Sequence, residues 1–287
     1  MLAVLRREFK SYFIAPTGYI FMGFFLLLSG IFFALINLMS ASAHYISVLA
    51  NITFIFLFAV PILTMRLMSE DKRLKTDQLL LTSPLSVTGL VLGKYFAAVG
   101  VFLLTILITC IYPVIINFFG ILAVWEVVGG YIGFFLLGSA FISVGLFVSS
   151  TTENQVVAAI ITFSALLFIW LIDWVQEILP KDALSGAVFA GLLILAIMYL
   201  VYRNTRDLWV SIIPAALGIG GVTATYFLNK TVFDGFIIRF FDWFSLLKRF
   251  KSFALGIFDL SAIVYYLSFS AVFIFLTIRI IEKRRWS

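Results

Sequence analysis

The sequence has little charge and almost no cysteine. Charged residues make up 12% of the chain and hydrophobic residues 63%, whereas a soluble domain is about one quarter charged and about half apolar. Cys110 is the only cysteine. The chain therefore forms no internal disulfide and has no cluster of cysteine ligands for a metal ion. Composition alone argues against a soluble globular domain.

Motifs for catalysis and for ion coupling are also missing. No GxxxxGK[ST] phosphate-binding loop occurs, and the glycine-rich stretch 217–221 lies in an apolar run without the lysine. The apolar runs hold almost no ionisable residues: Asp173 lies near one end of a run, and Lys94 and Arg279 are placed to extend toward the inner face. An ion-coupled carrier keeps such residues within its spans. We therefore expect neither an ion-coupled carrier nor an enzyme, and no cofactor bound by this chain.

Long apolar runs are what the sequence does contain. Runs of about 20 apolar residues indicate membrane-spanning helices. The run FMGFFLLLSGIFFALI shows no alternation of apolar and polar residues, which argues against a transmembrane barrel. The sequence therefore predicts an all-α integral membrane protein with about eight transmembrane helices, and six as the alternative. The predicted spans are 18–38, 51–69, 90–118, 129–150, 154–175, 186–202, 209–229 and 261–281.

The basic residues predict the orientation of these spans. With both termini in the cytoplasm, fourteen of the 20 Lys and Arg residues fall on the inner side, as the positive-inside rule requires. Residues 1–16 predict an amphipathic helix on the inner face. The apolar run from Tyr19 to Leu38 is longer than the core of a signal peptide, and Glu8 lies in the lead before it, so we expect a retained first span. The predicted location is the cell membrane, with a multi-pass topology.

Two further segments stand out on either side of the predicted membrane. Residues 230–260 predict one or two interfacial helices on the outer side, either as a packed cap or as a gate over an exit path. The charged stretch 65–86 lies on the inner side. Within it, Asp71 and Lys75 are spaced as a helical ion pair, and Pro84 ends the predicted helix 70–83. This stretch is either a topological loop or a coupling helix that docks on a cytoplasmic partner. Its acidic residues favour docking, because topology requires only Lys and Arg.

Four further features occur in order along the chain: EFKSYFIAPTGYIF (8–21), EDKRLKTDQLLLTSPLS (70–86) with LGKY (92–95), GLFVSSTTENQVVA (145–158) and LLKRFKSFALGIFDLSAIVYYLSF (246–269). In this order they resemble one protein family, the type-2 ABC exporter permeases, and most closely its gliding-motility-type subgroup. Two departures are visible. Lys75 occupies a position where the family commonly has Gly, and residues 186–229 exceed the usual six-span plan as a probable extra helix pair.

The resemblance implies a function and a set of partners. It implies the permease subunit of an ATP-driven exporter of the bacterial inner membrane, formed as a single transmembrane domain, 1–287, with residues 1–16 as its elbow helix. The implied partners are cytoplasmic ABC ATPase subunits, which would hold ATP and Mg, a second permease subunit and membrane lipids, with no nucleic acid. The implied ATPase-coupling residues are Glu70, Asp71, Lys72, Arg73, Lys75, Thr76, Asp77, Gln78, Glu153 and Asn154.

Two alternatives stay open from the sequence. The turn near residue 153 either contacts the ATPase or only caps the next helix, through a Thr152–Gln155 or Ser150–Glu153 capping box. The whole chain is either a permease or a membrane scaffold that anchors an ATPase complex without a transport path. The sequence identifies neither the cargo nor its binding residues.

Overall fold

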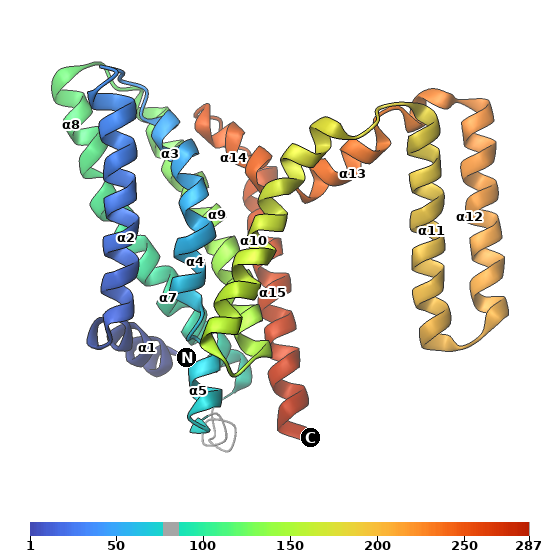
Figure 1. Cartoon of the computed structure of the whole chain (residues 1–287), viewed down its shortest axis with the longest axis horizontal. Coiled ribbons are helices and arrows are strands. Elements are labelled where there is room, and N and C mark those ends of the chain that lie inside the picture. The colour runs from blue at the N-terminus through green and yellow to red at the C-terminus, as the bar shows by residue number, and fades with distance from the viewer. Residues whose placement is uncertain (77–85, 287) are drawn as a thin grey trace. The chain divides into compact units, whose positions relative to one another are not determined.

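The computed structural model describes residues 1–76 and 86–286, and these residues form helices and loops without strands (Figure 1). Within them, eight helical segments are long and apolar enough to cross a membrane. The chain is thus an all-α multi-pass membrane protein, and the prediction of eight spans rather than six is confirmed. These segments are Pro16–Leu38, Ile46–Arg73, Val87–Phe119, Val124–Thr151, Gln155–Gln176, Ala183–Arg203, Leu208–Leu228 and Leu260–Arg284.

The transmembrane region consists of two compact units, which are described separately below. Unit 1 comprises Met1–Phe168 and Leu246–Ser287, and unit 2 comprises Ile169–Ser245. The boundary falls within helix α10 (Gln155–Ile178). The elements of unit 1 besides the start of α10 are α1 (Leu2–Ile14), α2 (Pro16–Phe33), η1 (Ala34–Leu38), α3 (Ile46–Ile52), η2 (Thr53–Ile55), α4 (Phe56–Thr64), α5 (Ser69–Arg73), α7 (Val87–Thr109), α8 (Ile111–Phe119), α9 (Val124–Thr151), α14 (Leu246–Ala254) and α15 (Leu260–Trp286).

Helix α9 forms the centre of unit 1 and packs against α3, α4, α7, α14 and α15. Its glycines permit this close packing, since a Cβ at Gly138 would overlap the ring of Phe102 and one at Gly145 would overlap Thr64. A buried cluster of aromatic rings surrounds the middle of α9, with centroids 4.6 to 6.4 Å apart. Its members are Phe25, Phe56, Phe102, Phe134 and Phe141. The core of unit 1 therefore depends on glycine and phenylalanine together.

Several breaks interrupt the helices of unit 1, among them the 3-10 segment η2 between α3 and α4 and the two described next. Pro113 has no N–H to donate to the carbonyl of Thr109, and the helix breaks at Cys110 between α7 and α8. The second break is η1, where the final turn of the first candidate span becomes a π-helix. The break near Pro113 therefore has a cause visible in the sequence, whereas the π-helix has none.

Unit 2 is built around a helical hairpin. Its elements besides the end of α10 are α11 (Ala183–Thr205), α12 (Leu208–Leu228), η3 (Lys230–Phe233) and α13 (Phe236–Phe244). Carboxylates cap both long helices: Asp182 accepts from the Ser185 amide at 3.0 Å and Asp207 from the Trp209 amide at 2.9 Å. The predicted helix pair at 186–229 is present. The sequence predicted one or two helices in residues 230–260, and besides η3 the structure has two α-helices there, α13 in unit 2 and α14 in unit 1.

Candidate functional site

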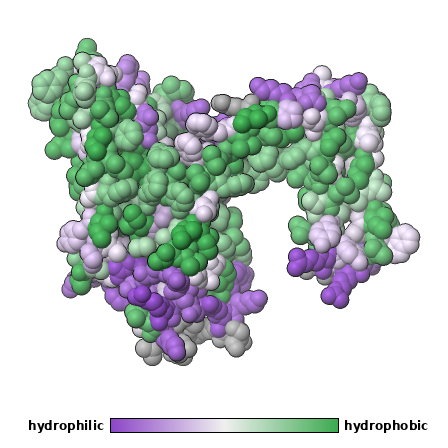
Figure 2. Space-filling view, in the orientation of Figure 1, coloured by the Kyte–Doolittle hydropathy of each residue, from purple (hydrophilic) through white to green (hydrophobic). Residues whose placement is uncertain are grey.

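One end of unit 1 carries a concentration of charge. Figure 2 shows hydrophilic side chains gathered at the end of unit 1 that holds α1 and α5. Helix α1 packs against α2 and α7 and buries Val4 and Tyr12. The Tyr12 hydroxyl donates to the Leu63 carbonyl at 2.8 Å, and burial raises its pKa well above the usual range, so it remains a donor. The predicted amphipathic N-terminal helix is therefore part of the packed structure of unit 1.

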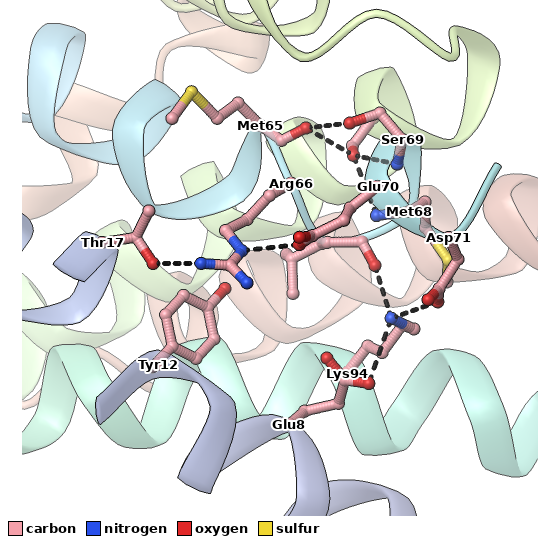
Figure 3. A network of polar contacts seen from close by, with 12 residues as sticks. Glu8, Tyr12, Thr17, Met65, Arg66, Met68, Ser69, Glu70, Asp71 and Lys94 are labelled. Carbon is pink, nitrogen blue, oxygen red and sulfur yellow. Dashed lines mark hydrogen bonds and ion pairs between the residues drawn. The ribbon is translucent and has the colours of Figure 1, made fainter. Parts of the chain in front are cut away.

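Lys94 of α7 connects three elements at this end (Figure 3). Its side chain is only 2% exposed, and its ammonium donates to the Leu67 carbonyl at 2.6 Å. The same nitrogen lies 2.7 Å from an Asp71 carboxylate oxygen and 3.3 Å from one of Glu8. Lys94 therefore does not reach water at the inner face, contrary to the sequence prediction. A buried ammonium needs such partners, because its charge is otherwise poorly solvated.

Arg66 makes a second connection beside Lys94. Its Nε donates to Glu70 at 2.8 Å, and its Nη1 donates to the Thr17 hydroxyl at 2.6 Å, joining the start of α2 to α5 (Figure 3). The helical ion pair of this segment is thus Arg66–Glu70. The predicted Asp71–Lys75 pair is wrong, because Asp71 faces Lys94 and Lys75 has a left-handed backbone with φ of 57°.

The same backbone feature shortens the predicted coupling helix. Helix α5 ends at Arg73, so the continuous helix expected from residue 70 is interrupted at Lys75. A left-handed residue after a helix is a common helix terminator and is usually glycine. The remainder of the predicted helix, including Asp77 and Gln78, lies outside the described residues.

Helix α5 is fixed to the end of α9. The Ser149 hydroxyl accepts from the amides of Met68 and Ser69 at 3.0 and 3.1 Å. The buried side chain of Lys72 donates to the Ser150 carbonyl. The side chain of Lys72 is therefore directed into unit 1. The side chains of Glu70 and Asp71 are also directed into this unit, Glu70 toward Arg66 and Asp71 toward Lys94. The sequence had assigned all three to contacts with a partner.

The turn between α9 and α10 is capped by Asn154. Its Oδ1 accepts from the amides of Val156 at 2.9 Å and Val157 at 3.4 Å. Both predicted capping boxes are wrong, because Asn154 itself is the N-cap. Glu153 is exposed, and its carboxylate lies 4.0 Å from the guanidinium of Arg284. This turn and α5 thus lie next to each other, joined by Lys72 and Ser150.

The predicted site residues therefore fall into two groups. Glu70, Asp71 and Lys72 bind within unit 1, and Thr76 donates to the Asp71 carboxylate at 3.1 Å. The exposed charged residues that a partner protein could contact are Arg73, Lys75 and Glu153, and the uncharged Asn154 is exposed beside Glu153. We call the three charged residues the exposed charged set. A polar cavity of about 280 Å³ lies beside it, lined in part by Arg7, Glu8, Arg66 and Lys94.

Sequence reasoning missed the residues that hold α5 in place. Glu8 and Lys94 were visible only as isolated charges at the edges of apolar runs, and no spacing rule joins residues so far apart in the chain. The four-residue spacing of Arg66 and Glu70 was a local signal that could have identified their ion pair. Hydrogen bonding by Glu8 raises the pKa of the neighbouring Arg7, which stays charged.

Among the described residues, no group of His, Cys, Asp and Glu is placed to hold a metal ion.

Comparison with known proteins adds no assignment. No protein-family model matches this chain, and no curated protein matches it. The candidate site therefore stands on its own geometry.

Proposed function

We propose that this chain is the permease subunit of an ATP-driven ABC transporter that works as an exporter. In this proposal, both termini face the cytoplasm, and the chain pairs with a second permease subunit. Separate cytoplasmic ATPase subunits bind ATP and Mg and dock at the charged end of unit 1. The observation that carries the proposal is the contact between Lys72 and the Ser150 carbonyl. This contact supports the proposal because it joins α5 to the end of α9, next to the turn at 153–154, and the resemblance implies ATPase contacts for both segments.

The polar network gives this surface a way to transmit motion. Helix α5 is bonded to α7 through Lys94, to α2 through Arg66 and to α9 through Ser149. A displacement of α5 by a closing ATPase pair would therefore act on several spans at once, instead of bending a loose loop. Packed elements held by several polar contacts move together. A small displacement at one of them is amplified because such a packed region switches between arrangements instead of deforming continuously.

The backbone at Lys75 lends separate support to the resemblance. This residue occupies the position where the permease family commonly has Gly, and its φ of 57° is a conformation that glycine adopts without strain. Lys75 therefore differs from the family's glycine in its side chain, but its backbone conformation is one that suits glycine.

The exposed charged set provides the test of ATPase docking. We expect the double variant Arg73→Glu with Lys75→Glu to lose co-purification with the ATPase subunit, because both side chains are exposed while their neighbours bind within unit 1. Thermal stability of the permease in detergent should be unchanged. The matched control is Arg6→Glu with Lys10→Glu, which makes the same charge change on exposed positions of α1.

The control should retain the ATPase. Co-purification of the Arg73 and Lys75 double variant at the wild-type yield would contradict the proposed docking surface. A second measurement distinguishes a transporter from a membrane scaffold without a transport path. If the chain is a transporter, ATP hydrolysis by the purified complex should depend on this subunit and respond to cargo.

A further inference from the structure

A buried amide without a complete set of partners lies at the end of unit 1 opposite α1 and α5. Asn37 belongs to the π-helix η1, a type of turn found often at functional sites. It is 3% exposed, and its amide nitrogen donates to the Ser42 carbonyl at 2.7 Å. Because a carbonyl only accepts, this bond identifies which amide atom is the oxygen. That oxygen, Oδ1, is buried and has no hydrogen-bond partner among the described residues.

Asn37 lines a cavity between η1, the following loop and α8. The cavity has a volume of about 370 Å³, near the lower end of the range for ligand sites. Its lining includes Leu38, Ile115, Ile116 and Phe119. The lining is largely apolar, and the hydroxyl of Ser42, its other polar side chain, already accepts from the His44 amide at 3.3 Å.

Water alone is a poor occupant for this cavity. A buried water typically makes about three hydrogen bonds, whereas Asn37 and Ser42 supply the only polar side chains among the lining residues. An apolar molecule with no polar group would fill the volume and leave the oxygen unpaired, which is unfavourable. The occupant that satisfies both features is apolar along most of its length and carries a hydrogen-bond donor at one end.

The position of the cavity indicates where such a molecule would come from. Asn37 and Phe119 lie at or next to the ends of two candidate spans, Pro16–Leu38 and Val87–Phe119. This is the level at which headgroups meet hydrocarbon in a bilayer. Large apolar side chains are exposed around the cavity, with Phe119 87% and Ile121 95% exposed. Figure 1 shows α8 at the end of unit 1 away from α1 and α5.

We propose that this cavity binds a membrane lipid whose headgroup donates a hydrogen bond to Asn37 Oδ1. Part of an acyl chain lies along Ile115, Ile116 and Phe119. The ammonium of an ethanolamine headgroup or the hydroxyl of a glycerol headgroup supplies the donor, and a choline headgroup does not, because its nitrogen is fully methylated. This site is independent of ATPase docking, so its test does not depend on the transport function proposed above.

The test uses the purified full chain, stripped of lipid in detergent, and native mass spectrometry. Dioleoyl phosphatidylethanolamine and dioleoyl phosphatidylcholine have the same chains and differ in the headgroup donor. We expect the ethanolamine lipid to bind about 5-fold more tightly, the effect of one net hydrogen bond. Asn37→Leu should bring the two lipids to equal affinity, and Asn117→Leu, at an exposed position on α8, should leave the preference intact.

Further arms distinguish the donor and protect the test against misfolding. Dioleoyl phosphatidylglycerol should also bind more tightly than the choline lipid if a hydroxyl serves as donor; binding of the ethanolamine lipid alone identifies the ammonium. Ala43→Phe, which fills the cavity from its lining, should weaken binding of all three lipids. Equal binding of the ethanolamine and choline lipids by the wild type, or a preference that survives both cavity substitutions, would overturn the proposal.

Discussion

Helix α9 of unit 1 and helix α12 of unit 2 are both apolar enough to cross a membrane, yet they differ in packing. In their most apolar windows, 78% of the residues of α9 are buried and only 6% of those of α12. The mean hydropathies of these windows are 2.1 and 1.6. Hydropathy therefore identifies both as spans and does not distinguish a core helix from one that packs in a hairpin and buries few of its residues.

Glycine shows the same contrast at the level of single residues. In α9, a Cβ at Gly145 would overlap three atoms of Thr64. In α12, nothing lies within 4 Å of a Cβ added at Gly220 or Gly221. The glycines of unit 1 permit helices to approach, as small residues do in membrane proteins generally. Gly220 and Gly221 have no such role within unit 2, although Gly186 lies against Phe233 and Gly218 against Ile194 in that unit.

The largest expected difference between the units is the loss of unfolding free energy when a lysine is replaced by methionine. Lys94→Met should destabilise the protein by about 3 kcal/mol, because it leaves Glu8 and Asp71 without their shared partner. The matched change in unit 2 is Lys230→Met. Lys230 is exposed and lies 5.5 Å from the Tyr226 ring, so its loss should cost less than about 1 kcal/mol.

Denaturant titration in detergent micelles measures both changes in unfolding free energy. Restoration of stability when Lys94→Met is combined with Glu8→Gln and Asp71→Asn would show that unpaired carboxylates are the cause. Equal effects of the two single lysine variants would remove the distinction between the buried network and the surface.

Glycine substitution should give the next largest difference. Gly145→Ala is expected to destabilise unit 1 by about 1–3 kcal/mol, because Thr64 and α4 must shift to admit the methyl group. Gly220→Ala should be neutral or stabilise by up to about 1 kcal/mol, since alanine favours helix and the space is open. The yield of monodisperse protein after stepwise heating ranks the two, and a loss at Gly220 equal to that at Gly145 would mean that α12 is packed against a partner.

The smallest expected effect, a gain in unfolding free energy from glycine at a left-handed residue, should be the same in both units. Lys75 of unit 1 and Arg206 of unit 2 have φ of 57° and 54°. The left-handed conformation disfavours a residue with a side chain by about 1–2 kcal/mol, and the greater freedom of unfolded glycine offsets about half of this gain. Lys75→Gly and Arg206→Gly should each raise the unfolding free energy by about 0.5 kcal/mol, measured by the same titration. A clear difference between them would show that packing also sets these turns.

The sequence was sufficient for features set by local composition. The eight spans, the amphipathic N-terminal helix and the helix pair 186–229 follow from runs of apolar residues, which act over one helix at a time. The ion pairs of Glu70 and Asp71 were not predicted. Arg66–Glu70 has the spacing of a local helical pair and was overlooked, whereas Lys94–Asp71 depends on how α7 packs, which no local pattern indicates. The Asn154 cap was missed since three neighbouring polar residues compete for that role, and backbone geometry decides among them.

The contacts of Lys94 also have a consequence for how the chain is made. Glu8 and Asp71 precede Lys94 in the sequence, and chains are synthesised from the N-terminus. During biogenesis the carboxylates of Glu8 and Asp71 are synthesised first. They have no Lys94 partner until the third span has been synthesised. The ion pair that fixes the N-terminal helix therefore forms late, and a chain truncated before residue 94 would hold this helix only by its apolar contacts and the Tyr12–Leu63 hydrogen bond.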